Sequence, residues 1–113
     1  MLQTKLTTLQ SKEELTNLIA QEEKVAVCCG RMGPMCIPVY GIFEVYEEKY
    51  PDIKFRNMDF DTPDANVIKL LPECRGFNGL PFTVYYRNGK VVKATTSIQS
   101  AKQIKDIMDE VFA

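Results

Sequence analysis

Residues 81–95 read PFTVYYRNGKVVKAT. Within them, two β-prone runs, 82–86 and 90–95, flank the triplet Arg87-Asn88-Gly89. An Asn-Gly pair between two such runs is the strongest short-range signal for a β-hairpin, because both residues tolerate the positive φ angles of the turn. The stretch therefore predicts two neighbouring antiparallel strands.

The segments outside this hairpin alternate between strand and helix signals. Residues 25–29 form a short continuous apolar run, typical of a strand that is covered on both faces of a sheet. Helix signals include a capping box at residues 11–14 and apolar residues at helical spacing in later segments. In the first half of the chain we expect an edge strand at 2–9, a helix from Ser11 to about Glu22, a strand at 25–29 and a helix from Pro34 or Pro38 to Tyr50. In the second half we expect a strand at 53–59, a short helix at 62–71 and the hairpin. A final helix should follow a cap at Ser97 or Gln99.

This order of elements decides the fold class. Consecutive strand–helix–strand units require parallel strands, whereas the hairpin requires an antiparallel pair. The chain is therefore expected to form an α/β domain with a central mixed β-sheet and helices on both faces. No linker, repeat or low-complexity stretch interrupts residues 1–113, so we expect a single domain.

Composition narrows the classes of function. The 113 residues carry 14 basic and 15 acidic side chains, and this net charge of −1 gives no attractive field for nucleic acid or for an anionic membrane. No stretch approaches the ~18 apolar residues of a membrane span, and the first residues do not resemble a cleavable leader, so we expect a cytoplasmic protein. The chain has no histidine, which excludes Ser-His and Cys-His mechanisms, and its four cysteines do not form a structural zinc motif.

The chain resembles the thioredoxin family in its predicted order of strands and helices, in a glycine–proline segment and in a further proline. The matching features are the order of elements, Gly33-Pro34-Met35-Cys36 after the central strand, Pro81 before the hairpin, and the Asn-Gly turn. The resemblance implies a thioredoxin fold and thiol–disulfide exchange without a cofactor or metal. It also implies a cis peptide bond at Leu80-Pro81, where the family forms a groove for an extended peptide.

The active-site segment departs from the family's Cys-Gly-Pro-Cys pattern. Counting back from Tyr50 places Cys36 on the second cysteine and a glycine on the first. Aligning on Gly33-Pro34 instead places Met32 and Met35 on the two cysteines, with Cys36 one position later. Neither alignment restores a pair of thiols, and an apolar residue replaces the aspartate that the family buries in its central strand.

Cys36 is the first candidate for a reactive thiol. It lies near the start of a helix, where free amides and the helix dipole favour a thiolate, and Arg31 adds a positive neighbour. Cys29 is the candidate second thiol, because the six-residue loop between the two cysteines allows their Cα atoms to come within the ~7 Å that a disulfide requires. The alternative reading is that both cysteines are small packing residues.

The two remaining cysteines have lesser expected roles. Cys28 should point to the opposite face of its strand from Cys29 and belong to the core. Cys74 lies in a glycine-rich loop and is expected to be exposed. An exposed thiol suits glutathionylation or an intermolecular disulfide, so a Cys74-linked dimer is the alternative to a monomer.

Met32 and Met35 flank Gly33-Pro34 and would surround the peptide groove with flexible, polarisable side chains. The candidate substrate-binding residues are Met32, Gly33, Pro34, Met35, Leu80 and Pro81. With Cys36 as a third ligand, the two methionines also form a chemically reasonable Cu(I) set, although no histidine supports it. Core packing is the third reading of the methionines.

Two hypotheses of function follow. In the first, the chain exchanges disulfides with protein thiols or disulfides through Cys36, either with an external thiol or with Cys29 as resolving partner. In the second, it is a redox-inactive binding or adaptor module that holds an extended peptide in the groove beside Pro81. Neither hypothesis requires a cofactor, nucleic acid or a membrane.

Overall fold

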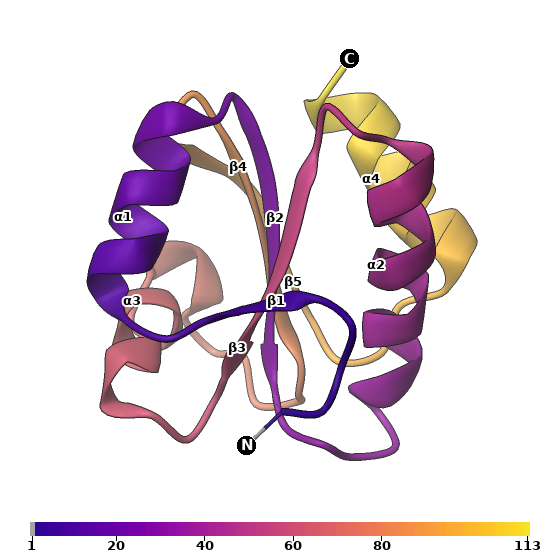
Figure 1. The fold of residues 1–113 in the computed structure, drawn as a ribbon. Helices are drawn as coiled ribbons and strands as arrows, with labels where there is room; N and C mark the ends of the chain where they lie inside the picture. Colours follow the sequence, from indigo (N-terminus) through magenta and orange to yellow (C-terminus); the bar gives the residue numbers. More distant parts are fainter. Residues whose placement is uncertain (1) are drawn as a thin grey trace.

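The computed structural model of the chain describes residues 2–113, and its centre is a five-stranded sheet (Figure 1). The strands are β1 (Thr7–Leu9), β2 (Lys24–Gly30), β3 (Lys54–Asp59), β4 (Phe82–Arg87) and β5 (Lys90–Thr96). Their order across the sheet is β1-β3-β2-β4-β5. β3 runs parallel to β1 and β2, whereas β4 is antiparallel to β2 and β5. The expected mixed sheet is thus confirmed.

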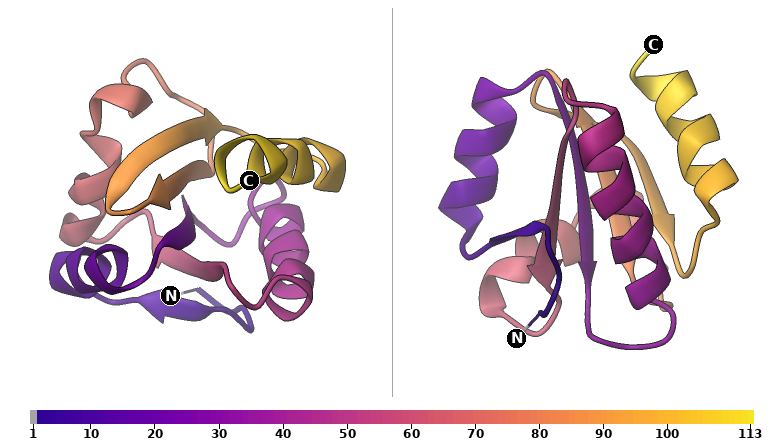
Figure 2. Two further views of the ribbon diagram at one scale, coloured as in Figure 1. Left: turned by 90° about the horizontal axis from the view of Figure 1, so that it is seen from above. Right: turned by 45° about the vertical axis from the view of Figure 1, so that its right-hand side comes forward.

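Helices cover both faces of this sheet, as the sequence predicted (Figures 1 and 2). They are α1 (Lys12–Gln21), α2 (Ile37–Lys49), α3 (Asn66–Lys69) and α4 (Ala101–Val111), with short 3₁₀ turns at η1 (Pro63–Ala65) and η2 (Pro72–Cys74). α1 and α3 lie on one face, and α2 and α4 lie on the other (Figure 1). Within residues 2–113, no helix combines the length and apolar character needed to cross a bilayer.

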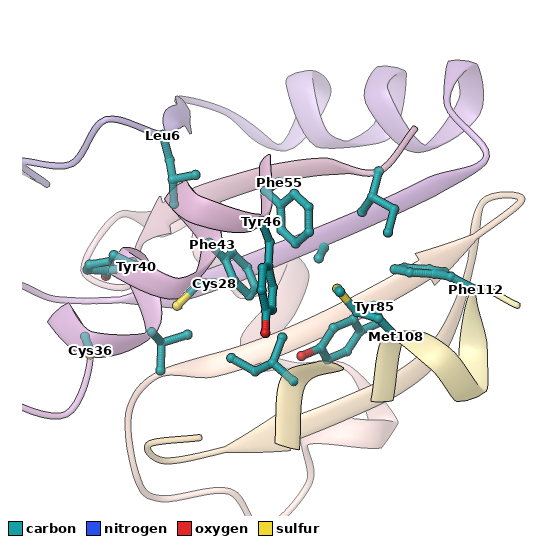
Figure 3. Packing of buried hydrophobic residues seen from close by; sticks show 14 residues of the cluster. Leu6, Cys28, Cys36, Tyr40, Phe43, Tyr46, Phe55, Tyr85, Met108 and Phe112 are labelled. Carbon is teal, nitrogen blue, oxygen red and sulfur yellow. The ribbon is translucent and has the colours of Figure 1, made fainter. Parts of the chain in front are cut away.

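β2 separates two apolar clusters, because successive side chains of a strand point to opposite faces. The α2-side cluster, part of which is drawn in Figure 3, contains Ala26, Cys28, Cys36, Val39, Tyr40, Phe43, Phe55, Tyr85, Ile104 and Met108, among others. The α1-side cluster contains Leu15, Val25, Val27, Cys29, Met58, Ile68, Cys74, Phe82, Val84 and Tyr86, among others. All residues of β2 after Lys24 are buried, as expected for a central strand.

Local signals explain several element boundaries. Asn88 and Gly89 have φ angles of 53° and 82°, as the hairpin turn requires. The Ser11 hydroxyl accepts a hydrogen bond from the Glu14 amide at 3.2 Å and so caps α1. Pro38 lies in the first turn of α2, where its missing amide hydrogen is not needed, so it starts this helix and does not kink it.

β1 and the expected helix at 62–71 are shorter than the sequence predicted. Residues 2–6 do not join the sheet. The amides of Lys5 and Leu6 instead donate to the side chains of Glu44 and Thr4. The helix at 62–71 consists of the η1 turn followed by only four residues of α3.

α4 begins after Ser100, so the expected caps at Ser97 and Gln99 are wrong. The Ser100 hydroxyl accepts a hydrogen bond from the Gln103 amide at 3.1 Å, and the Gln103 side chain accepts one from the Ser100 amide at 2.8 Å. This reciprocal capping box satisfies two amides at once. Ser97 instead takes a φ angle of 70° in the turn after β5.

We expect Ser100→Ala to lower the free energy of unfolding by about 1 kcal/mol, because it removes the cap of α4. Urea denaturation followed by circular dichroism measures this change. Gln99→Ala is the matched control, since the Gln99 side chain donates only to the adjacent Ile98 carbonyl. An equal loss of stability in both variants would contradict the assignment of Ser100 as the cap.

Candidate thiol site

Three segments meet at Gly30, the last residue of β2. A Cβ atom placed on Gly30 would lie 2.7 Å from Cys36 Sγ, 2.9 Å from the Tyr40 hydroxyl oxygen and 3.1 Å from Pro81 Cβ. The end of β2, the start of α2 and the segment before β4 are therefore in contact at this point. The Leu80-Pro81 peptide bond is cis, which confirms the expectation from the resemblance.

Cys36 lies immediately before α2, and its side chain is buried. The Gly33 carbonyl accepts hydrogen bonds from the amides of Cys36 and Ile37 at 3.1 and 3.0 Å, and this turn leads the chain into the helix. Cys36 is only 2% exposed and belongs to the α2-side cluster. Its Sγ accepts a hydrogen bond from the Arg31 amide at 3.5 Å.

Burial and charge have opposite effects on the Cys36 thiol. Burial raises its pKa from the ordinary value of 9.0, because a thiolate loses solvation inside the protein. The hydrogen bond from the Arg31 amide and the charge of the Arg31 guanidinium lower this pKa. Burial has the larger effect, so Cys36 is mainly a neutral thiol at neutral pH.

Arg31 is held by contacts to its side chain and to its backbone. Its Nε and Nη2 atoms donate to the two carboxylate oxygens of Asp61 at 2.8 and 2.7 Å. The guanidinium lies over the Phe60 ring, 5.3 Å from the centroid. The Arg31 carbonyl accepts a hydrogen bond from the Tyr40 hydroxyl at 3.1 Å. A bidentate ion pair has a defined geometry, so these contacts fix the start of the loop that leads to Cys36.

Cys29 and Cys36 lie on opposite faces of the sheet. Cys29 belongs to the α1-side cluster, whereas Cys36 belongs to the α2-side cluster. Burial raises the pKa of Cys29 to about 12. The loop is long enough to join the two residues, but the Cys29 side chain points away, and this geometry disfavours it as the resolving thiol. Cys28 is buried on the same face as Cys36.

Cys74 is buried, so the expectation of an exposed loop thiol is wrong. It is 3% exposed and packs in the α1-side cluster with Cys29. The η2 turn is closed by a hydrogen bond from the Cys74 amide to the Leu71 carbonyl at 2.9 Å, and this turn carries the cysteine into the apolar cluster. Burial raises the pKa of Cys74 to about 11, which makes it poorly suited to an intermolecular disulfide.

Met32, Met35 and Ile37 are exposed apolar residues close to Cys36 in the sequence, and we call these three residues the loop surface. Their side chains are 40%, 43% and 48% exposed, so the core-packing reading of the methionines is wrong. Met32 Sδ accepts a hydrogen bond from the Gln3 amide at 3.3 Å, while the Cys36 side chain is buried. This arrangement does not favour the Cu(I) set of two methionines and Cys36.

Gly30, Tyr40 and Ile37 belong to the site although the sequence alone did not point to them. Gly30 carried a readable signal, because a glycine in a strand often marks the close approach of another segment. The role of Tyr40 depends on a hydroxyl contact to the loop, and helical spacing predicts only that such a side chain is buried. The exposure of Ile37 depends on the exact start of α2, which two prolines left open.

Comparison with solved structures gives the same fold at low identity. Mitochondrial thioredoxin 3 from Saccharomyces cerevisiae has a TM-score of 0.76 and 21% identity, covering 94% of this chain and 95% of that one. Thioredoxin f2 from Chlamydomonas reinhardtii has a TM-score of 0.74 and 18% identity, covering 94% and 96%. A Malassezia sympodialis thioredoxin has a TM-score of 0.76 and 13% identity, covering 100% and 96%.

No protein-family model and no curated protein sequence matches the chain. The likeness to thioredoxins therefore lies in the three-dimensional structure, and it extends over nearly the full length of both partners in each comparison. The chain has a thioredoxin-like fold.

Proposed function

We propose that the chain carries out thiol–disulfide exchange through Cys36, with protein disulfides as partners. The observation that carries this proposal is the position of the Cys36 sulfur at the start of α2, beside Pro81, where the Arg31 amide donates to it. An amide donor and a nearby positive charge both stabilise a thiolate, which is the reactive form. The structural likeness to thioredoxins supports a redox role.

The exchange proceeds in two balanced steps. The Cys36 thiolate attacks one sulfur of the partner disulfide, and the other sulfur leaves as a thiolate that takes up a proton. This step produces a mixed disulfide between Cys36 and the partner. In the second step, external thiols cleave the mixed disulfide. The first attacks Cys36 Sγ and releases the remaining partner sulfur as a thiolate, and the second frees Cys36, so the two external thiols supply two electrons and end as a disulfide.

The surroundings of Cys36 predict slow exchange. Its raised pKa leaves little thiolate at neutral pH. The sulfur is also enclosed by Gly30, Tyr40 and Pro81, and the residue is almost fully buried. A partner disulfide therefore reaches the sulfur only when the loop at residues 31–35 moves outward.

A second function, the binding of an extended apolar peptide without redox chemistry, is favoured by the loop surface. Met32, Met35 and Ile37 expose apolar side chains close together in sequence, on either side of Cys36. Contiguous exposed apolar side chains often mark an interaction site, and methionine adapts its shape to different partners. The two functions differ in whether the Cys36 sulfur is needed.

We expect the chain to reduce insulin disulfides slowly in the presence of dithiothreitol, and Cys36→Ser to abolish this activity. The turbidity of precipitating insulin chains measures the rate. Cys29→Ser and Cys74→Ser are matched controls that should retain the activity, because both side chains lie in the α1-side cluster. Activity that survives Cys36→Ser would overturn the proposal.

The rate of Cys36 alkylation should still be rising as the pH passes the ordinary thiol pKa of 9.0, because burial raises the pKa of this thiol. Arg31→Gln should slow alkylation at neutral pH by up to about tenfold, the factor for one pKa unit, since it removes a charge that stabilises the thiolate. The exposed Arg75 provides the control Arg75→Gln. Iodoacetamide labelling with peptide mass spectrometry gives the rates. If the alkylation rate levels off well below pH 9.0, burial is not the main influence on the pKa of Cys36.

Peptide binding at the loop surface should weaken by about tenfold, or ~1.4 kcal/mol, in Met32→Glu and in Met35→Glu, because each places a charge in an apolar contact. Fluorescence anisotropy of a labelled extended peptide with leucine at alternate positions measures the affinity. Val45→Glu is the control, since Val45 is an exposed apolar residue of α2 outside the loop surface. Equal affinities of Met32→Glu and Val45→Glu would rule out this binding surface.

A further inference from the structure

A line of polar side chains crosses the sheet beneath α2 and α4. Thr8, Asn57, Cys28, Thr83 and Thr95 lie opposite one another on β1, β3, β2, β4 and β5, and we call these five residues the polar rung. Residues in register point to the same face of a sheet. Since Cys28 belongs to the α2-side cluster, the polar rung faces α2 and α4.

Hydrogen bonds within the described part of the chain leave the polar rung partly unsatisfied. Asn57 and Thr83 are fully buried, and Asn57 Oδ1, Thr83 Oγ1 and Thr95 Oγ1 have no partner among residues 2–113. The Asn57 amide nitrogen donates to Thr4 Oγ1 at 2.6 Å, so its acceptor oxygen is the unused atom. Folded proteins keep few such atoms because they are destabilising. Among residues 2–113 the others of this kind are limited to the Tyr85 hydroxyl, so most of these atoms lie on the polar rung that contains Cys28.

Cys28 also lies on the same face as Cys36 and near it. Gly30 follows Cys28 by two residues on β2, so the two positions are about 6.6 Å apart along the strand. The Cys36 sulfur lies 2.7 Å from the Cβ position of Gly30, which puts it within about 9 Å of Cys28 Cβ. Figure 3 shows both cysteines in the α2-side cluster, toward the end that contains Tyr40. Burial, followed by the neighbouring Cys36 thiolate, raises the pKa of Cys28.

We propose that Cys28 is the resolving thiol for Cys36, an assignment that rests on the exchange proposed at Cys36. Once a partner disulfide has formed a mixed disulfide with Cys36, the Cys28 thiolate attacks Cys36 Sγ. The bond between Cys28 and Cys36 forms, and the bond between Cys36 and the partner breaks. The departing partner thiolate takes up the proton that Cys28 gave up. The chain thus loses two hydrogen atoms, and the partner disulfide is reduced to two thiols.

The polar rung supplies the hydrogen-bonding groups that a thiol in the core needs for this step. Asn57 and Thr83 are the direct neighbours of Cys28 on β3 and β4. Neither side-chain oxygen has a hydrogen-bond partner among residues 2–113, so both are available to Cys28 during the step. Asn57 Oδ1 offers an acceptor for the S–H group, and the Thr83 side chain, which lowers the pKa of Cys28, offers a donor for the thiolate. A disulfide requires Cβ atoms within about 4.5 Å, so Cys36 must move closer to β2 for the second step than it lies in the resting structure.

The test uses the folded full chain and an aromatic nitrobenzoate disulfide as the partner. This reagent releases one coloured thiolate when it forms a mixed disulfide at Cys36, and a second when an internal thiol resolves it. We expect two thiolates for each Cys36 that reacts, and a Cys28–Cys36 disulfide in peptide maps made after acid quenching. Cys28→Ala should release one thiolate and keep the adduct on Cys36. Cys29→Ala is the matched control, an equally buried neighbour on the opposite face, and should behave like the parent chain.

The outcomes separate this inference from the proposed exchange. An adduct that resolves equally well in Cys28→Ala, or that persists in the parent chain, would overturn the role of Cys28 and leave exchange at Cys36 intact. Absence of any adduct at Cys36 in the folded parent would overturn the exchange itself.

Two further variants keep the test decisive. Cys28→Ser preserves size and polarity and replaces Cys28→Ala if the alanine impairs folding. Thr83→Val should slow release of the second thiolate and leave the first unchanged, because it removes the donor to the Cys28 thiolate. Unchanged rates for both releases in Thr83→Val would overturn the role of the polar rung.

Discussion

The absence of a side chain at Gly30 is the constraint on which the site depends. Cys36 Sγ, the Tyr40 hydroxyl and Pro81 Cβ all lie within 3.1 Å of the position that a Cβ atom would occupy there. Any larger residue would force the Cys36 sulfur and the Tyr40 hydroxyl away from their present positions against β2. Glycine weakens a strand through its backbone entropy, but here it permits the contact that assembles the thiol site from three distant parts of the sequence.

Around this contact, Arg31 links the electrostatics of the thiol to the conformation of the loop. Its amide donates to Cys36 Sγ, its carbonyl accepts from Tyr40, and its guanidinium is held by Asp61. The groups that stabilise the thiolate therefore also hold the loop closed over it. Burial still dominates the pKa of Cys36, so the thiol that these contacts enclose is mainly neutral.

The sequence predicted those features that depend on neighbouring residues, such as the hairpin turn at Asn88-Gly89, and the resemblance predicted the cis bond at Leu80-Pro81. It failed where two residues compete for one role or where the environment is non-local. Several polar residues precede α4, and only the reciprocal bonds with Gln103 select Ser100 as the cap. The glycines after Cys74 suggested an exposed loop, but the η2 turn carries that cysteine into the α1-side cluster.

The choice of a second thiol near Cys36 also depends on a non-local environment that the sequence does not predict. Alternation along β2 is predictable, so the sequence establishes that Cys28 and Cys29 point to opposite faces. Which face meets α2 depends on the path of the chain through the whole sheet, and the number of residues in the connecting loop carries no information about it. Cys29 is closer to Cys36 in sequence but lies across the sheet, whereas Cys28 shares its cluster and is flanked by the buried polar groups of Asn57 and Thr83. For thiols near the end of a strand, the face of the sheet must therefore be established before loop length can be used to pair them.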